Sequence, residues 1–248
     1  MNIQSLWVGR SLSTLEKLSI NSFLKNGHEY HLYVYDDFEA PDGTVFKDAN
    51  DIMPRKEIFY YKSGKGKGSV SAFSNIFRYE LLNKKGGIWV DCDVVCVKPF
   101  DFYAEYVFAS EARWDTRRLG LCLPYCLPGK IAAASHVIKC PIHSDFSEYC
   151  LKICSKKNRN DLIWGEIGPE LVEQSIIENN LSEFQMPIKV FSPINYWKTE
   201  DLILKAGNID LETYAVHLWH EIWRRRKYDT EKSYHKDSVF EKLKRMYL

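Results

Sequence analysis

Two aspartates one residue apart, Asp91 and Asp93, directly follow the short apolar run of residues 88–90. On extended backbone, side chains at positions i and i+2 point to the same side of the chain, so the two carboxylates lie together. Paired carboxylates at the end of a buried strand repel each other and lose hydration, and a divalent cation between them relieves both costs. The same triplet also occurs in solvated turns, but here the flanking residues favour a cation site that can hold a metal diphosphate.

The elements that must position this pair alternate between strands and helices. Short apolar runs predict strands at residues 3–8, 30–35, 88–90, 94–97, 106–110 and 130–138. Apolar positions at helical spacing predict helices from a cap at Ser11 or Ser13 to about residue 25, and at residues 69–85, 141–155 and 166–179. Residues 36–54 are polar and read as irregular. The alternation favours an α/β fold with a mostly parallel sheet.

Composition limits the classes of function. The 34 Lys and Arg side chains nearly balance the 33 Asp and Glu side chains, so no overall field favours nucleic acid. The start lacks a signal-peptide pattern and no apolar run approaches a membrane span, so we expect a cytoplasmic protein. Seven cysteines without a Cys-x-x-Cys pair predict reduced thiols. Four of them have helical spacing and are either metal ligands or buried thiols: Cys122, Cys126, Cys150 and Cys154.

Several short segments occur in an order that resembles a known enzyme family. They are Leu6-Trp7-Val8-Gly9, residues 30–37, residues 72–79, residues 86–93, Gly168-Pro169 and the His-x-Trp-x-x-x-Trp run of residues 217–223. The chain is similar to the DXD-containing, sugar-nucleotide-dependent glycosyltransferases of family 32, and more distantly to the glucosyltransferase domains of large clostridial toxins. The resemblance implies a GT-A fold over residues 1–223. It also implies retaining transfer of a hexose, with galactose favoured, from a UDP-sugar to a hydroxyl of a glycan or a lipid-linked acceptor.

The resemblance also implies which residues act. Asp91, Asp93 and His217 are the expected metal ligands, although His217 in isolation also fits a packed strand end. Hard oxygen ligands favour Mg²⁺ or Mn²⁺, and a histidine nitrogen favours Mn²⁺. Arg78 is expected to act with Asp91 and Asp93 in catalysis. It lies three residues after Asn75 on one helix face, with a surface ion pair to Glu80 or Asp93 as the alternative.

The donor-binding set implied by the resemblance is Trp7, Ser74, Asn75, Arg78, Asp91, Trp219 and Trp223. Trp7 ends the first strand, where an indole can stack on uracil or else belong to the core. Relatives have Asp at the position of Asn75, and an amide both donates and accepts hydrogen bonds, so donor choice is expected to differ here. Glu221 and Ile222 replace the small Gly-Ser pair that usually precedes the last Trp of the family.

Two basic segments have open interpretations. The lysines of residues 62–68, in a flexible Gly-rich loop, meet an anionic acceptor or phosphates, or are simply solvated. Residues 224–248 form a basic amphipathic segment with nine Lys and Arg against four Asp and Glu. Its apolar stripe fits either docking on its own domain or peripheral binding to an anionic membrane.

Two other functions compete. A haloacid-dehalogenase-like phosphatase would use Asp91 as nucleophile and Asp93 as acid and base, but no later Gly-Asp-x-x-x-Asp completes its magnesium site. A non-catalytic protein that binds carbohydrate or a membrane surface would use the aromatic residues and the basic C-terminal segment. That function leaves Arg78 and the acidic pair unexplained.

Overall fold

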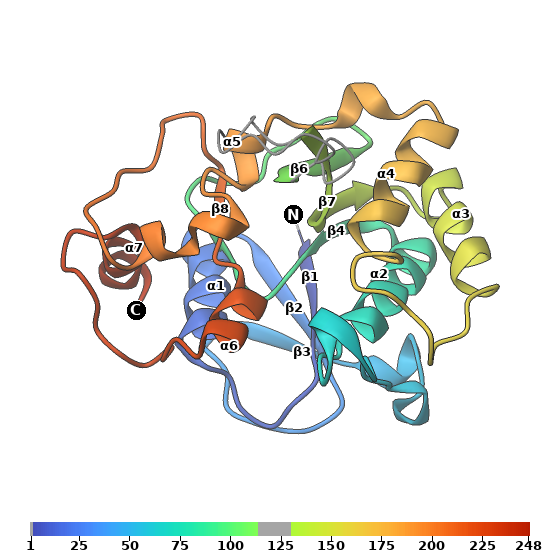
Figure 1. The fold of residues 1–248 in the computed structure, drawn as a ribbon, viewed down its shortest axis with the longest axis horizontal. Coiled ribbons are helices and arrows are strands. Elements are labelled where there is room, and N and C mark those ends of the chain that lie inside the picture. Colours follow the sequence, from blue (N-terminus) through green and yellow to red (C-terminus); the bar gives the residue numbers. More distant parts are fainter. Residues whose placement is uncertain (1, 114–129) are drawn as a thin grey trace, which may run out of the picture.

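The computed structural model describes residues 2–113 and 130–248, and a six-stranded sheet lies at its centre (Figure 1). The strand order is β3-β2-β1-β4-β7-β6. The strands are β1 (Asn2–Trp7), β2 (Glu29–Val34), β3 (Thr44–Asp48), β4 (Gly87–Val90), β6 (Val107–Arg113) and β7 (Lys130–Cys140). The first four are mutually parallel, whereas β7 runs antiparallel to both β4 and β6. The predicted α/β fold with a mostly parallel sheet is confirmed, and β3 adds a strand in a stretch predicted to be irregular.

Helices cover both faces of the sheet (Figure 1). They are α1 (Thr14–Lys25), α2 (Ser71–Lys85), α3 (Asp145–Cys154), α4 (Pro169–Glu178), α5 (Ile188–Phe191), α6 (His220–Arg226) and α7 (Val239–Tyr247). Short 3-10 helices occur at Ala49–Asp51, Arg55–Glu57, Gly64–Gly66, Ser182–Phe184 and Tyr196–Leu202. Helices α2, α3 and α4 pack together on one face, and α1 and α7 contact each other on the other. A separate two-stranded ladder joins β5 (Val94–Cys96) to β8 (Ala215–His217).

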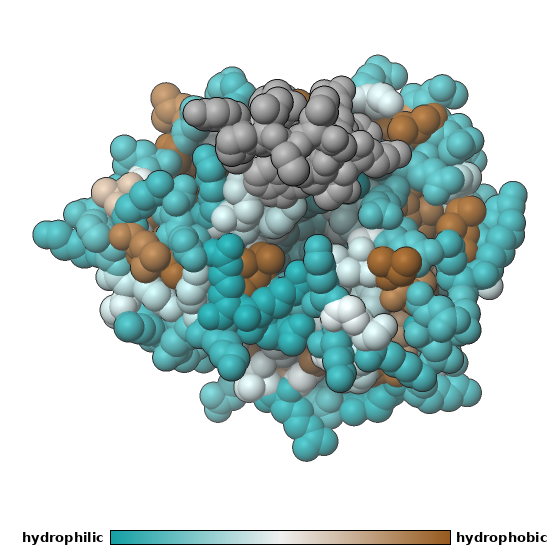
Figure 2. Space-filling view, viewed as in Figure 1, coloured by the Kyte–Doolittle hydropathy of each residue, from teal (hydrophilic) through white to brown (hydrophobic). Residues whose placement is uncertain are grey.

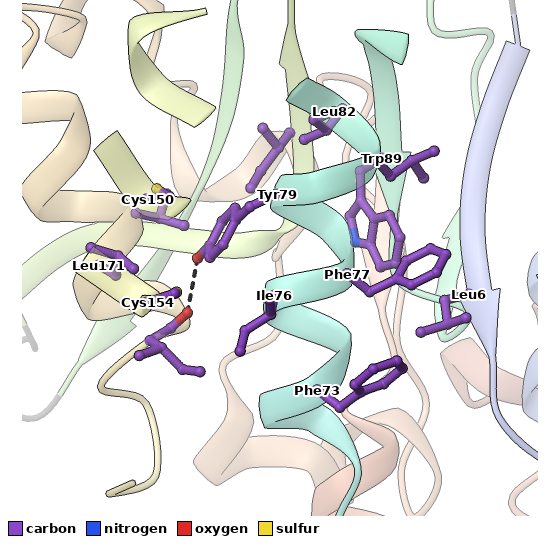
Figure 3. Close-up of a cluster of buried hydrophobic side chains, with 14 of the residues drawn as sticks. Leu6, Phe73, Ile76, Phe77, Tyr79, Leu82, Trp89, Cys150, Cys154 and Leu171 are labelled. Carbon is purple, nitrogen blue, oxygen red and sulfur yellow. Dashed lines mark hydrogen bonds between the residues drawn. The ribbon is translucent and has the colours of Figure 1, made fainter. Parts of the chain in front are cut away.

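The strand β4 shows how alternation builds two core layers around the sheet. Ile88 and Val90 face the layer that contains α1, whereas Trp89 faces the layer beneath α2. In Figure 3, Trp89 lies beside Phe77, between α2 and the strand β1 that carries Leu6. The sheet is therefore buried on both faces, which fixes the position of the acidic pair that follows β4.

The C-terminal helix α7 docks on the domain. Val239, Phe240, Leu243 and Tyr247 are buried in a cluster shared with α1, β5, β8 and α6, while Met246 stays exposed. The apolar stripe that a membrane-bound helix would need is therefore largely covered by the protein itself. In the described ranges 2–113 and 130–248, no helix has the length and apolar character needed to cross a bilayer.

The cysteines with helical spacing have separate outcomes. Cys150 and Cys154 are free thiols on α3, buried near Tyr79 on the side of α2 away from β1 (Figure 3). Burial raises the pKa of the Cys154 thiol to about 12, so it is a packed thiol and not a reactive one. Cys122 and Cys126 lie outside the described residues.

Candidate active site

The turn between β4 and β5 carries the acidic pair and is held on both sides. The backbone N–H of Asp91 donates to the carbonyl of His136 on β7, at 2.9 Å, and the N–H of Leu218 donates to the carbonyl of Asp93, also at 2.9 Å. The ladder between β5 and β8 places Val94 opposite His217. These backbone hydrogen bonds hold the acidic turn against His136 on β7 and His217 on β8, two segments that are distant in the sequence.

Asp91, Asp93 and His217 together offer ligand atoms that lie within 4.8 Å of one another. The imidazole Nε2 of His217 lies 3.3 Å from Asp93 Oδ2, and its buried Nδ1 has no hydrogen-bond partner among the described residues. Asp91 Oδ2 and Asp93 Oδ1 likewise accept no hydrogen bond within the described ranges. Two carboxylate oxygens and an imidazole nitrogen are a donor set that suits a divalent cation such as Mn²⁺ or Mg²⁺.

The pKa values in this cluster diverge because the environments of the two carboxyls differ. Burial raises the pKa of Asp91 above its ordinary value, although the nearby Arg78 guanidinium opposes that rise. Burial also acts on Asp93, but the charge and hydrogen bond of His217 and the N–H of His220 outweigh it and hold its pKa well below the usual range. Burial lowers the pKa of His217, but the charge and hydrogen bond of Asp93, together with the charges of Asp91 and Glu111, outweigh burial and raise this pKa above its ordinary value. A bound cation would stabilise the ionised form of Asp91 that burial disfavours.

Arg78 binds Asp91 and not the two carboxylates considered from its spacing in the sequence. Its side chain is 2% exposed, and its Nη2 donates to Asp91 Oδ1 at 2.6 Å. Its Nη1 donates to Asn75 Oδ1 at 2.9 Å, and its guanidinium lies 4.8 Å from the centre of the Trp89 ring. The indole Nε1 of Trp89 donates to the same oxygen of Asp91 at 2.7 Å. One carboxylate oxygen is thus fixed by two donors, which leaves the other available to a ligand.

Asn75 lies against a glycine that begins α4. A Cβ at Gly168 would lie 2.9 Å from Asn75 Nδ2, so any larger residue would displace the amide. Ser74, the preceding residue of α2, is half-buried at the same end of the helix. Helix α2 therefore connects Asn75 to the acidic turn through Arg78.

Trp7 lies at the carboxyl end of β1, half-buried, with its ring nearly parallel to that of His220. The two planes differ by 9° and the ring centres are 6.5 Å apart. His220 in turn donates its backbone N–H to Asp93 Oδ2 at 2.7 Å, and its Nδ1 lies 2.9 Å from Glu16 Oε1. Glu16 is fully buried and caps α1 through its other oxygen. The position expected to bind the base is thus connected to the acidic pair through His220.

The two C-terminal tryptophans have different surroundings. Trp219 adopts a left-handed backbone with φ of 62°, and its ring centre lies 3.9 Å from that of His217. Trp223 is fully buried among Tyr228, Tyr234 and Phe240. Trp223 therefore has no surface with which to contact a donor in this structure. Its indole packs in the core against Phe240, which corrects the expectation that Trp223 belongs to the donor-binding set.

His136 and Glu16 belong to the site and were not identified from the sequence. The His136 ring stacks on that of His217 with centres 4.2 Å apart, and its Nε2 hydrogen-bonds Ser192 Oγ at 2.9 Å. Burial lowers the pKa of His136 well below its ordinary value, so it packs as a neutral ring. In the sequence, His136 stands out as a histidine inside an apolar strand, but nothing in its spacing connects it to the acidic pair.

Comparisons with known proteins identify a sugar-binding region in this chain. Residues 13–111 match the family model of the glycosyltransferase sugar-binding region containing a DXD motif. Among solved structures, the chain is similar to the PaToxG glycosyltransferase, with 14% identity and a TM-score of 0.46 over 72% of this chain and 68% of that one. It is also similar to a mutant transferase, with 11% identity and a TM-score of 0.44 over 75% of this chain and 91% of that one. Curated proteins give no match.

The family match covers α1, α2 and the acidic turn, which include both aspartates and Arg78. A sugar-binding region of this kind supports neither the phosphatase nor the non-catalytic binding protein considered above. The protein is therefore an enzyme of the glycosyltransferase type, with its DXD sugar-binding region in residues 13–111.

Proposed function

We propose that the protein is a metal-dependent, retaining hexosyltransferase that moves a sugar, with galactose favoured, from a UDP-sugar to a hydroxyl of a glycan or glycolipid. The observation that supports the proposal is the cluster of Asp91, Asp93 and His217 beside the buried Arg78. One potential ligand atom of each of the three lies within 4.8 Å of the others. Such a cluster is suited to the diphosphate of a nucleotide sugar. The five described cysteines are free thiols, which supports a reducing compartment such as the cytoplasm.

Asp91, Asp93 and His217 would hold the cation, which when bound neutralises the diphosphate and acts as a Lewis acid on the leaving group. Arg78 orients Asp91 and adds a positive charge beside the phosphates. Trp7, at the carboxyl end of β1, offers a flat face for the base at the usual ligand edge of a parallel sheet. The acceptor hydroxyl attacks from the face that the diphosphate leaves, and its proton passes to the departing phosphate oxygen. The protein's share is positional and electrostatic.

Donor binding tests this function without knowledge of the acceptor. Ligand at about a hundredfold excess over its Kd stabilises the folded state by about 2.7 kcal/mol. For a domain of this size that raises Tm by roughly 5–10 °C. We expect this rise for UDP-hexoses with Mn²⁺, a smaller one with Mg²⁺, and none with a chelator or with GDP-sugars. Equal stabilisation by GDP-sugars, or stabilisation by UDP without a metal, would contradict the proposal.

Asn75→Asp is expected to change the preference between donor sugars. The carboxylate keeps the bond from Arg78 but cannot donate to a sugar hydroxyl, as the amide Nδ2 can. One hydrogen bond to a hydroxyl is worth about 1 kcal/mol, so the ratio of kcat/KM for UDP-galactose and UDP-glucose should shift about fivefold to tenfold. The measurement is that ratio in the mutant and in Asn21→Asp on α1 as a control. An equal loss for every donor would show that Asn75 only supports Arg78.

A further inference from the structure

We propose that the loop of residues 62–68 and the C-terminal half of α6 form one cationic surface that binds a phosphate-bearing acceptor. This inference rests on the proposed function, because it assigns the acceptor class to the same site. The surface consists of Lys62, Lys65, Lys67, Arg224, Arg225 and Lys227, and is called the cationic rim below. In Figure 2 hydrophilic side chains cover the region of α6 on the face shown.

Backbone hydrogen bonds close the base of the loop that carries the lysines. The backbone N–H of Tyr61 donates to the carbonyl of Ser69 at 3.0 Å, and the N–H of Gly68 donates to the carbonyl of Tyr61 at 2.9 Å, so the two ends of the loop are hydrogen-bonded to each other. Gly66 is buried at the base, where a Cβ would lie 2.3 Å from the Trp164 ring. The three lysines therefore extend from a loop whose base is held by hydrogen bonds and packing.

The loop and α6 touch each other. The guanidinium of Arg225 lies 4.3 Å from the centre of the Trp164 ring. The centre of the Tyr61 ring lies 5.3 Å from that of Trp164. Arg224 Nη2 donates to the carbonyl of Lys67 at 3.5 Å. Helix α6 and the lysine-bearing loop therefore lie side by side.

Two segments of the chain connect the cationic rim to the acidic turn. His220, at the start of α6, donates to Asp93, and Arg224 follows one helical turn later, about 6 Å along the axis. On the other side, the segment after Trp164 leads to Gly168, which lies against Asn75. A group bound at the rim is therefore within the length of a sugar or two of the acidic turn.

The charge of the rim is not neutralised within the described part of the chain. Lys62, Lys65 and Lys67 are exposed and make no ion pair with any described residue. Glu221 is the carboxylate shared by Arg224 and Arg225. The acids near Trp164 are Glu166, which pairs with Lys157, and Glu170, which lies beside Gly165.

This excess of positive charge fits a phosphate, which carries up to two negative charges and several acceptor oxygens. The donor diphosphate already has its own site at the acidic turn and Arg78. Because positive and negative side chains nearly balance over the whole protein, this local excess of positive charge is not a result of a basic composition. The acceptor that fits is a sugar whose reactive hydroxyl lies close to a phosphate.

The experiment compares two acceptors in the full-length enzyme, an alkyl glycoside and the same sugar joined to the alkyl chain through a phosphate. The variant is the triple Lys62→Gln, Lys65→Gln, Lys67→Gln. The matched control is the triple Lys152→Gln, Lys232→Gln, Lys236→Gln, which removes the same charge from other exposed sites. The readouts are acceptor KM, kcat, the Kd of each acceptor probe by calorimetry in the presence of UDP and Mn²⁺, and the Kd of UDP.

We expect the wild type to bind the phosphate-bearing probe more tightly than the neutral one. The loop triple should weaken binding of the phosphate-bearing probe about tenfold, and less at high salt. It should leave the Kd of the neutral probe and the Kd of UDP unchanged. The control triple should bind all three ligands as the wild type does. Equal binding of both probes by the wild type would overturn the proposal. A loss of UDP affinity in the loop triple would assign the lysines to the donor instead.

Vesicles of phosphatidylglycerol without any sugar separate a lipid surface from an acceptor phosphate. Charge-dependent binding of these vesicles that is lost in the loop triple, without preference between the two sugar probes, would also overturn the proposal. Failure of the enzyme to bind UDP with Mn²⁺ at all would instead contradict the proposed function, so the two failures are distinguishable.

Discussion

Asp93→Asn is expected to lower metal-dependent transfer about a thousandfold, which corresponds to roughly 4 kcal/mol of transition-state stabilisation. The asparagine can still accept the N–H of His220, so the turn keeps its shape. It cannot supply the negative charge that Asp93 holds with its lowered pKa. Metal affinity should fall together with kcat. The measurement is UDP release against Mn²⁺ concentration, with Mn²⁺ binding followed separately by calorimetry.

Asp101→Asn is the matched control, because Asp101 is exposed and precedes β6 in a loop away from the cation ligands. It should leave both metal affinity and turnover unchanged. Full turnover in Asp93→Asn, with an unaltered dependence on Mn²⁺, would remove the acidic pair from the cation site. Unfolding of the variant is checked by its Tm, and Asp91→Asn then repeats the experiment at the other carboxylate.

Arg78→Lys is the second large effect that we expect, with a loss of about a hundredfold in kcat/KM, or roughly 2.7 kcal/mol. Arginine here contacts Asp91, Asn75 and the Trp89 ring with one planar group. A lysine keeps the charge but offers a point contact, so it cannot serve all three partners from a buried position. The loss should come mainly from kcat, because the position of Asp91 is disturbed while the proposed base-binding face of Trp7 is not.

The control for this prediction is Arg245→Lys, at an exposed position of α7. Steady-state kinetics with UDP-sugar and Mn²⁺, combined with Tm, separate loss of function from loss of folding. A fall in Tm that alone accounts for the lost activity would make Arg78 a structural residue. An unchanged kcat would remove it from the site.

Local patterns in the sequence predicted much of the fold. Short apolar runs located β1, β2, β4 and β5 to within two residues, because most of the residues in these strands are buried. Ser13 proved to be the cap of α1, with Glu16 completing a capping box. Helix α2 was expected from its stripe and its Gly86 stop, and the structure begins it two residues later, at Ser71.

The missing parts depend on contacts between distant residues. Strand β3 is half-exposed at the sheet edge, so its sequence shows little apolar signal. The antiparallel direction of β7 follows from pairing with β4 and cannot be read from either strand alone. Glu16 looks like an ordinary capping residue until its second oxygen is seen to reach His220. Trp223 illustrates the opposite error, because a motif position alone does not distinguish a residue that contacts ligand from one that packs beneath it.

The ladder between β5 and β8 makes the proposed cation site conditional on a segment that is synthesised well after the acidic pair. Asp91 and Asp93 emerge early, but His217 and the N–H of His220 reach them only after β8 has paired with β5. A nascent chain therefore carries the acidic pair before the three proposed metal ligands have come together. This ladder of two short strands stands apart from the main sheet and should open at a lower free energy than the sheet does. Metal and donor would then protect the amides of β8 from hydrogen exchange more than those of β1, so that ligand occupancy is coupled to the folding of the C-terminal quarter of the enzyme.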